Sequence, residues 1–440
     1  MVSLLHMLTF LLPLYFIGDN RVPSLSQLLK NSNNLTYVTF ESICSEGLKL
    51  IASYCGSSLR VIKAEVNSDS KEAIIALCKS CPNLTICDLQ CQSEENINGD
   101  EVIQAAVRHC LLIEVLPIAK WTLTDAAVGS LATIHTLKVL KLSSSCTYAY
   151  ESLYRALHAN PSLEELEIHG KSHINATAES SIGRHCGNLR KVYIPHYRYT
   201  SYILDSQALW NVFHGCRLLE EVSLHCIVTN ATLRTLFQYC RCLSKLNISC
   251  SEAPIVILPV DNEPILYDVY PSLTSLGLCH TFGGTTSVVF RDIFTYFTSL
   301  RTVDLAACSL VTDDLLLTLT HTCCKLEVLY FFSCANVTVA GLLEALSHCP
   351  TIRELYVSCL PFDDEALVQV SLICPKLNKF ALYSCTGFIT EIGVLAVADT
   401  CTQLRVLTLS SQVPKIPLTP ALKLLNDNSV NRRLIFSIDT

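Results

Sequence analysis

The sequence predicts an α/β solenoid in which a short strand and a helix alternate about 15–16 times. An apolar motif, Leu-x-x-Leu-x-Leu with Ile, Val or Phe at some positions, recurs along the chain, and its successive first positions lie 24 to 30 residues apart. Cysteines recur at fixed phases of the same motif. A length of 440 residues would otherwise favour two or three globular domains, which do not produce such a period. We therefore expect residues 1–440 to form one solenoid.

Each copy of the motif predicts a strand with one buried face. In the copy that begins at Leu326, the apolar residues Leu329 and Phe331 alternate with outward positions, as on a half-buried strand. We call the first apolar residue of each copy its anchor. The anchors are Leu5, Leu35, Leu59, Leu84, Ile113, Leu137, Leu163, Leu189, Leu219, Leu243, Leu273, Leu300, Leu326, Ile352, Leu377 and Leu404.

The segments between these strands predict helices. In residues 311–319, Thr312 or Asp313 is a candidate N-cap, and the apolar residues that follow line one side of a helix. Thr124-Asp125 and Asp363-Asp364 begin similar segments. Stacking such units buries a continuous core between two layers, so we expect a horseshoe with a parallel concave sheet and outer helices.

Composition excludes several classes of protein. Half of the residues are hydrophobic and 16% are charged, which excludes a disordered chain. The net charge of -7 and the absence of a Lys/Arg run disfavour nucleic-acid binding. Met1–Gly18 is the one long uncharged stretch, but no basic residue precedes Arg21 and no small-residue cleavage site follows. We interpret this stretch as a repeat strand, and we do not expect a membrane protein.

The 24 cysteines mark phases of the repeat. Nine lie three residues before an anchor, where a free thiol behaves as a small buried hydrophobe. This pattern predicts reduced thiols and a cytoplasmic or nuclear protein. Cys78-x-x-Cys81 with Cys87 and Cys91 has the density of a zinc site, but three of these four fall on repeat phases, so we expect no metal.

Two segments carry a resemblance to a known family. Cys323-x-x-Leu326-x-x-Leu329-x-Phe331-x-x-Cys334 and Cys349-Pro350-x-Ile352-x-x-Leu355-x-Val357-x-Cys359 resemble the cysteine-containing leucine-rich repeat, familiar from the substrate-binding half of F-box proteins. The resemblance covers essentially the whole chain. It implies a leucine-rich-repeat fold and substrate recognition for an SCF-type (cullin-RING) ubiquitin ligase.

The F-box itself is not visible in this sequence. Leu5-x-x-Leu8-x-Phe10 is already on phase with the repeat, and no Leu-Pro module precedes it. The resemblance therefore implies the SCF adaptor subunit as a partner only if an F-box is encoded upstream of Met1. No nucleophile elbow, zinc-protease motif, P-loop or dinucleotide-binding glycine signature occurs, so we expect no enzyme and no cofactor.

Binding is expected on the concave face, where side chains four and six positions after each anchor point outward. Three late copies place four aromatic residues there, which predicts a partner-binding site because exposed aromatic clusters are enriched at binding hot spots. These residues are Tyr330, Phe332, Tyr356 and Tyr383. Two alternatives are that the rings stack on one another and that the C-terminal segment covers them. A second candidate is the aromatic stretch Tyr193–Tyr199, for which the alternative is an ordinary packed loop.

Two further segments depart from the repeat. Residues 251–270 contain three prolines and predict an irregular insertion loop, and residues 411–440 predict a C-terminal capping segment in which Leu434-Ile435-Phe436 adds a final strand. The sequence thus favours a non-enzymatic protein-binding solenoid that recognises a protein substrate on its concave face. The alternatives are a secreted or membrane-anchored receptor or adhesion ectodomain, with Met1–Gly18 as its signal, and a free-standing scaffold without a ligase role.

Overall fold

The structure is a computed structural model that describes most of the chain. The described residues are 7–9, 22–30, 34–91, 98–116, 121–142, 146, 149–169, 176–194, 206–225, 228–249, 269–279, 291, 293–308, 311–334, 336–410 and 435–439. The chain divides into two compact units. Unit 1 comprises Met1–Ser201 and Gln207–Leu219, and unit 2 comprises Tyr202–Ser206 and Glu220–Thr440.

Unit 1 alternates strands and helices. Its strands β1–β4 pair in parallel in that order, as do β5–β7, and Val115 bridges Ile86 of β4 and Val139 of β5. The elements are β1 (Met7–Thr9), α1 (Val22–Lys30), β2 (Tyr37–Ile43), α2 (Ser45–Cys55), β3 (Val61–Val66), α3 (Lys71–Ser80), β4 (Ile86–Cys91), α4 (Asp100–His109), α5 (Asp125–Ser130), β5 (Val139–Leu142), α6 (Tyr150–Ala159), β6 (Glu165–Ile168), α7 (Ala176–His185), β7 (Lys191–Ile194) and α8 (Ser206–Gly215).

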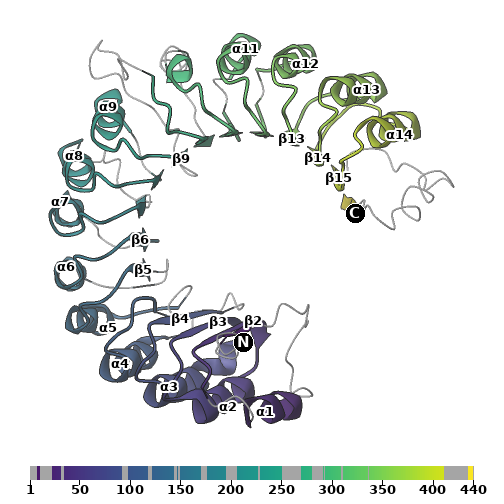
Figure 1. Cartoon of the computed structure of the whole chain (residues 1–440). Helices are drawn as coiled ribbons and strands as arrows, with labels where there is room; N and C mark the ends of the chain where they lie inside the picture. The colour runs from purple at the N-terminus through teal and green to yellow at the C-terminus, as the bar shows by residue number, and fades with distance from the viewer. Residues whose placement is uncertain are drawn as a thin grey trace. The chain divides into compact units, whose positions relative to one another are not determined.

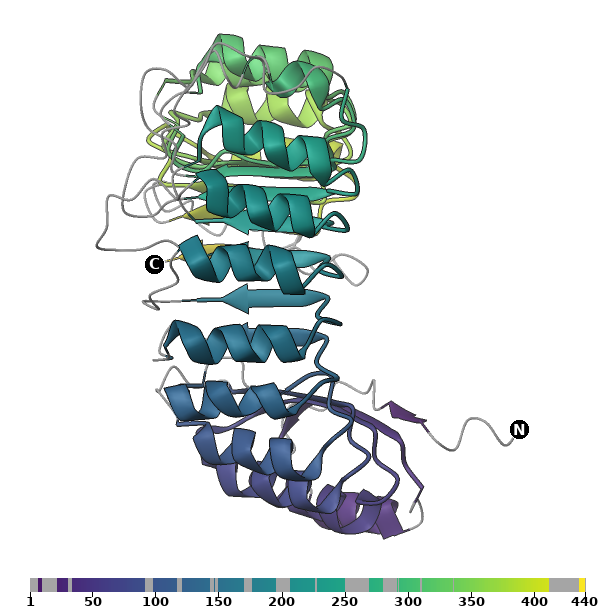
Figure 2. The same cartoon turned by 90° about the vertical axis from the view of Figure 1, so that its left-hand side faces the viewer.

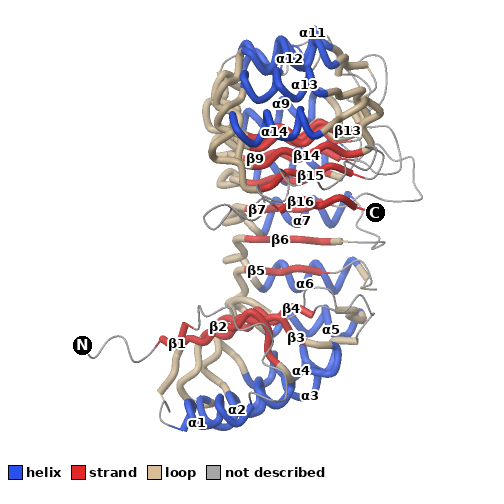
Figure 3. The backbone as a smooth tube through the Cα atoms, turned by 90° about the vertical axis from the view of Figure 1, so that its right-hand side faces the viewer, coloured by secondary structure: helices blue, strands red, loops and turns tan. Residues whose placement is uncertain are grey.

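Unit 2 repeats the same arrangement, with strands β8 to β16 paired in parallel in sequence order. Figure 1 shows the helices of each unit on one side of its strands, and Figures 2 and 3 show neighbouring helices and neighbouring strands stacked side by side. The elements are β8 (Glu221–Leu224), α9 (Asn230–Tyr239), β9 (Lys245–Ser249), β10 (Ser275–Cys279), β11 (Thr302–Asp304), α11 (Asp313–Thr322), β12 (Val328–Phe331), α12 (Val339–Ser347), β13 (Glu354–Ser358), α13 (Asp364–Ile373), β14 (Lys379–Tyr383), α14 (Glu391–Thr400), β15 (Val406–Ser410) and β16 (Ile435–Asp439).

The predicted α/β leucine-rich-repeat solenoid is confirmed. Where the strands are fully described they follow the anchors, and the three apolar positions of each motif point into the core, as in Leu326, Leu329 and Phe331, whose exposed fractions are 0–1%. The strands pair in parallel and the helices form a second layer, as expected, but β1–β4 form a sheet of their own, separate from the one that begins at β5. No helix among the described residues is long and apolar enough to span a bilayer.

The helix starts link each coil to the next. Thr312 caps α11, since its hydroxyl accepts the N–H of Leu315, and Asp363 caps α13 in the same way. The structure adds a bond that the sequence did not reveal. The Asp313 carboxylate accepts the N–H (2.9 Å) and the hydroxyl (2.8 Å) of Thr338, the cap of the following helix. Asp364 contacts Thr390 with the same geometry.

The cysteines before the anchors are buried and also act as donors. The thiol of Cys349 lies 3.4 Å from the Cys323 carbonyl one coil earlier, and that of Cys216 lies 3.3 Å from the Cys186 carbonyl. Burial raises the pKa of the Cys186 and Cys323 thiols to about 12, so these groups stay protonated and unreactive. A thiol at this phase therefore fills space and bonds a carbonyl that closes the preceding coil.

Asn160 occupies the position that cysteine fills in other coils. It is fully buried, and its Oδ1 accepts the N–H of Leu137 (3.1 Å). Its Nδ2 donates to the carbonyls of Ala156 (2.9 Å) and Leu131 (3.3 Å). One side chain thus satisfies backbone groups of two coils that have no access to water.

We expect Asn160→Ala to destabilise the protein by about 2–3 kcal/mol, because it leaves buried backbone groups without hydrogen-bond partners. Asn160→Cys should lose less stability than Asn160→Ala, since a cysteine thiol bonds the backbone at this position in other coils. The control is Asn188→Ala, which removes an exposed amide that donates to Pro161 and should cost below about 0.5 kcal/mol. Urea unfolding measures all three, and equal stability of Asn160→Ala and Asn188→Ala would contradict this account.

Candidate functional site

One face of each sheet is left uncovered by the helices, and we call it the open face. In most strands the buried core residues alternate with half-exposed residues on this face, as the burial of β5 shows for Val139, Leu140, Lys141 and Leu142. The open face of each unit is described by itself.

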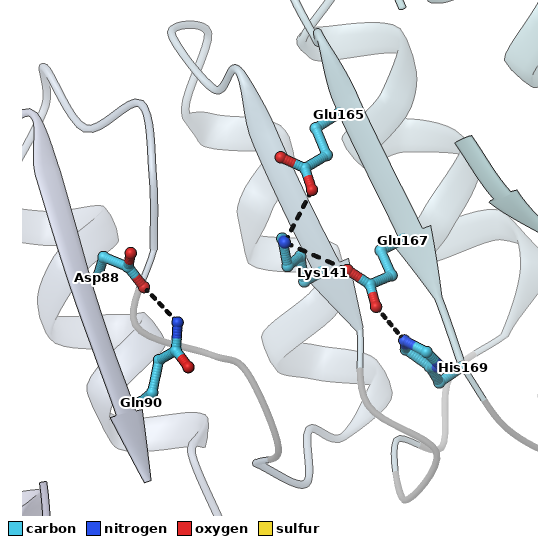
Figure 4. A network of polar contacts seen from close by, with 6 residues as sticks. All are labelled: Asp88, Gln90, Lys141, Glu165, Glu167 and His169. Atoms are coloured by element: carbon cyan, nitrogen blue, oxygen red, sulfur yellow. Dashed lines mark hydrogen bonds and ion pairs between the residues drawn. The ribbon is translucent and has the colours of Figure 1, made fainter. Parts of the chain in front are cut away.

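A polar network lies on the open face of β5 and β6 in unit 1, and a separate polar pair lies on β4 (Figure 4). Lys141 Nζ lies 2.8 Å from Glu165 Oε1 and 3.3 Å from Glu167 Oε2. The other carboxylate oxygen of Glu167 contacts His169 Nε2. On β4, the Gln90 amide donates to Asp88 Oδ1 at 3.4 Å. The charges of β5 and β6 are therefore largely paired with each other.

The contacts of Glu167 change its titration. The hydrogen bond from His169 and the nearby Lys141 lower the pKa of this carboxyl to about 2, although burial acts in the opposite direction. The His169 ring also packs on Tyr193, with ring centroids 4.2 Å apart. Burial and the Glu167 charge raise the pKa of Tyr193. Glu167 is thus held ionised at the centre of the network.

A shallow depression of about 210 Å³ lies beside this network, on the open face of β3 to β6. Its polar lining comes from Lys63, Asp88, Gln90, Lys141 and Glu165. Both signs of charge are present, and the ion pairs already satisfy Lys141 and Glu165. A partner here would have to compete with bonds inside the sheet.

The open face of unit 2 carries the four aromatic residues singled out from the sequence, and the structure brings them together. The rings of Tyr330 and Tyr356 stack with centroids 4.5 Å apart and an interplanar angle of 16°. Phe332 lies 5.6 Å from Tyr383 and 6.4 Å from Tyr356. All four residues are half-exposed. The rings therefore stack on one another and still face solvent, so we call them the aromatic cluster.

Neighbouring groups fix the aromatic cluster in place. The Tyr356 hydroxyl donates to Glu354 Oε2 at 3.0 Å, and Glu354 pairs with Lys379 at 3.1 Å. Burial, followed by the bond to Glu354, raises the pKa of Tyr356. Ala381, which pairs with Tyr356 in the sheet register, is buried at 2% exposure. The small Ala381 side chain therefore leaves room beside the Tyr356 ring.

The backbone turns sharply after the strands β11 to β14. Among the described residues, four that are not glycine have a positive φ of 51° to 60°, and each lies seven positions after an anchor. They are Ala307, Ser333, Cys359 and Ser384. This conformation costs about 1–2 kcal/mol for a residue with a Cβ, so the surrounding coil must enforce it. A hydrogen bond between neighbouring coils contributes to this, since the Ser333 N–H donates to Ser358 Oγ at 2.9 Å.

A second depression, of about 220 Å³, adjoins the aromatic cluster in unit 2. Its floor is Gly277, which lies between Asn247 and Asp304 in the register of β9, β10 and β11. A Cβ at Gly277 would lie 2.6 Å from Asn247 Oδ1, so glycine leaves space for that amide. Tyr330 lines one end of the depression. The repeat pattern of the sequence does not predict this site.

Other sequence candidates are only partly described. Of the stretch Tyr193–Tyr199, only Tyr193 and Ile194 lie within the described residues, and of residues 251–270 only 269 and 270 do. Tyr270 is buried, and its hydroxyl donates to the Cys240 carbonyl, so it closes a coil. Cys78, Cys81, Cys87 and Cys91 are buried, and the described residues contain no group of three or more His, Cys, Asp and Glu side chains that could hold a metal ion.

Comparison with known proteins gives structural likenesses only. No protein-family model matches the sequence, and no curated protein matches it. Many solved structures are similar to this chain, and three of them illustrate the likeness. A chain of the mouse RP105/MD-1 complex is 14% identical with a TM-score of 0.46, and the match covers 92% of this chain and 76% of that one. A chain of the yeast Rad7–Elc1 complex is 17% identical with a TM-score of 0.46, covering 85% and 84%.

The third is an internalin from Listeria monocytogenes, which is 15% identical with a TM-score of 0.41 and covers 97% of this chain and 96% of its own. At these identities and TM-scores, what this chain binds has to be inferred from its own open faces.

We expect the polar network to make stability depend on pH. The pKa of Glu167 is about 2 in the folded protein against 4.5 in the unfolded chain, so the unfolded state binds more protons between these values. The contribution is complete above about pH 5 and disappears as the pH falls towards 2. Wild type should lose more stability than Glu167→Gln over this range in urea unfolding. Parallel stability curves for the two proteins would contradict the assignment.

Proposed function

We propose that this chain is a non-enzymatic solenoid that binds another protein on the open face of unit 2. The aromatic cluster carries the proposal, because it places four half-exposed rings on three neighbouring coils. Burying such rings against a partner releases water from a large apolar area, and aromatic residues dominate the energetics of protein interfaces.

The cluster is ordered before any partner arrives. Tyr330 and Tyr356 stack, the Tyr356 hydroxyl is bonded to Glu354, and Phe332 contacts both Tyr356 and Tyr383. Side chains that are already fixed lose little conformational entropy on binding. This favours a surface built for recognition over a set of unrelated exposed rings.

We expect Tyr330→Ala combined with Tyr356→Ala to reduce partner capture at least about tenfold, since each buried aromatic contributes on the order of 2 kcal/mol at a hot spot. Proteins crosslinked to the chain in cells and quantified by mass spectrometry provide the measurement. The control is Tyr239→Ala, which truncates a half-buried tyrosine on the outer helix α9. The proposal fails if the double variant captures the same proteins at the same level as the control.

A finer proposal concerns the role of this binding. We propose that the bound protein is a substrate and that the chain serves as the recognition part of an SCF-type ubiquitin ligase in ubiquitin-dependent degradation, in the cytoplasm or nucleus. Its support is the resemblance of the repeats to the cysteine-containing leucine-rich repeat of F-box proteins. In this chain, buried cysteines such as Cys323 and Cys349 precede the anchors. The rival role is that of a secreted or membrane-anchored receptor.

Tagging the protein at the 3′ end of its own gene separates these roles. The ligase role predicts that a cullin and its adaptor subunit co-purify with the tagged protein, and that nearly all 24 cysteines react with a thiol reagent after denaturation without reductant. Recovery from the medium with N-glycans and oxidised cysteines would overturn it. A cytoplasmic protein without cullin or adaptor would instead indicate a free-standing scaffold.

A further inference from the structure

The depression over Gly277 contains an acceptor that nothing in the described structure satisfies. Asn247 Oδ1 is inaccessible to solvent and has no hydrogen-bond partner among the described residues. A buried acceptor without a donor costs about 1–3 kcal/mol, so such groups normally mark a place where water or a ligand belongs. Asn247 lines the depression with Gly277, and the glycine leaves the amide oxygen room to lie there.

The opposite wall supplies a fixed negative charge. Asp304 Oδ1 accepts the N–H of Ala306 at 3.0 Å, and the Asp304 carboxylate also accepts the thiol proton of Cys279. Burial, followed by the Asp304 charge, raises the pKa of the Cys279 thiol, which keeps it a donor. Two donors therefore hold the carboxylate in one orientation while it lines the depression.

The remaining charges of the lining leave this carboxylate unmatched. Glu221 and Lys245 pair with each other at 3.3 Å. The described ion pairs include none with Asp304, so the depression carries a net negative charge. The Tyr330 ring at its end stacks on Tyr356 on the far side and lines the depression on the near side.

We propose that this depression receives an arginine side chain of the bound protein. The guanidinium would donate to the Asp304 carboxylate and, once the Asn247 amide turns to expose its Oδ1, to that oxygen, and its plane would lie against the Tyr330 ring. The volume of about 220 Å³ has room for several waters of about 30 Å³ each, and hence for one long side chain. This inference rests on the proposed function, because it names the chemistry of the partner.

The strand register also predicts how far apart the arginine and an apolar residue lie in the partner. The depression lies at β10 and β11, and the centre of the aromatic cluster lies at β13. Strands lie about 5 Å apart, so the two are separated by roughly 10–14 Å, which an extended chain spans in about three or four residues. The arginine should therefore lie three or four positions from an apolar residue that contacts the aromatic cluster.

A random-peptide display library panned on the full chain tests both ideas. We expect the selected peptides to contain an arginine three or four positions from an apolar residue. The best peptide is then synthesised with arginine and with citrulline, its neutral isostere, and both are titrated against wild type and Asp304→Asn. Citrulline should weaken binding to wild type about tenfold and binding to Asp304→Asn far less. Asp399→Asn, an exposed change on α14, should behave as wild type.

The outcomes separate the two proposals. If peptides bind in a way that depends on Tyr330 and Tyr356 but contain no arginine, or if citrulline weakens wild type and Asp304→Asn equally, the arginine site is wrong and the proposed function stands. If no peptide binding depends on Tyr330 and Tyr356, the proposed function is wrong. Asn247→Ala, checked for folding by thermal unfolding, provides a second variant and should weaken the arginine peptide several-fold. Unchanged affinity would contradict the role of Asn247 as acceptor.

Discussion

Every other feature of this protein depends on the stacking of each coil on its neighbours. A single coil of strand and helix cannot enclose its own apolar residues, because most of the surface that would cover them belongs to the next coil. Leu326, Leu329 and Phe331 have exposed fractions of 0–1%, and their strand is paired on both sides with the strands of the adjacent coils. Stacking also buries the backbone groups where each coil closes, so a donor or acceptor is needed at that point.

This requirement explains how residues of different chemistry fill one position. The thiol of Cys349, the amide of Asn160 and the hydroxyl of Tyr270 all bond backbone groups near the closing turn. The repeat in the sequence is enough to identify this position, three residues before each anchor, and to show that cysteine fills it most often. Asn160 and Tyr270 were not recognised, because a side chain that substitutes chemically for a thiol leaves no trace in an apolar pattern.

Features in which one residue type repeats could be predicted from the sequence, whereas contacts that depend on the register between coils could not. The aromatic cluster could be found because Tyr330 and Tyr356 share a phase of the motif. The depression could not, since it depends on a glycine at 277 beside an amide at 247, one coil away. The bond from Thr338 to Asp313 likewise joins residues 25 positions apart. Phase alone gives the face on which a residue lies, whereas such contacts also require side-chain shape.

The open faces of the two units differ in what they have left to offer a partner. In unit 1, Lys141 is bound to Glu165 and Glu167, and Glu167 also holds His169, so a partner would remove paired charges from water and gain few new bonds.

In unit 2, residues with a positive φ follow β11 to β14, the rings of the aromatic cluster are half-exposed, and the neighbouring depression keeps Asn247 Oδ1 and the Asp304 charge without a matching group among the described residues. Strain and unsatisfied groups both cost stability, and a fold retains them most readily where a ligand recovers the loss. Unit 2 is therefore where binding has the most free energy to gain.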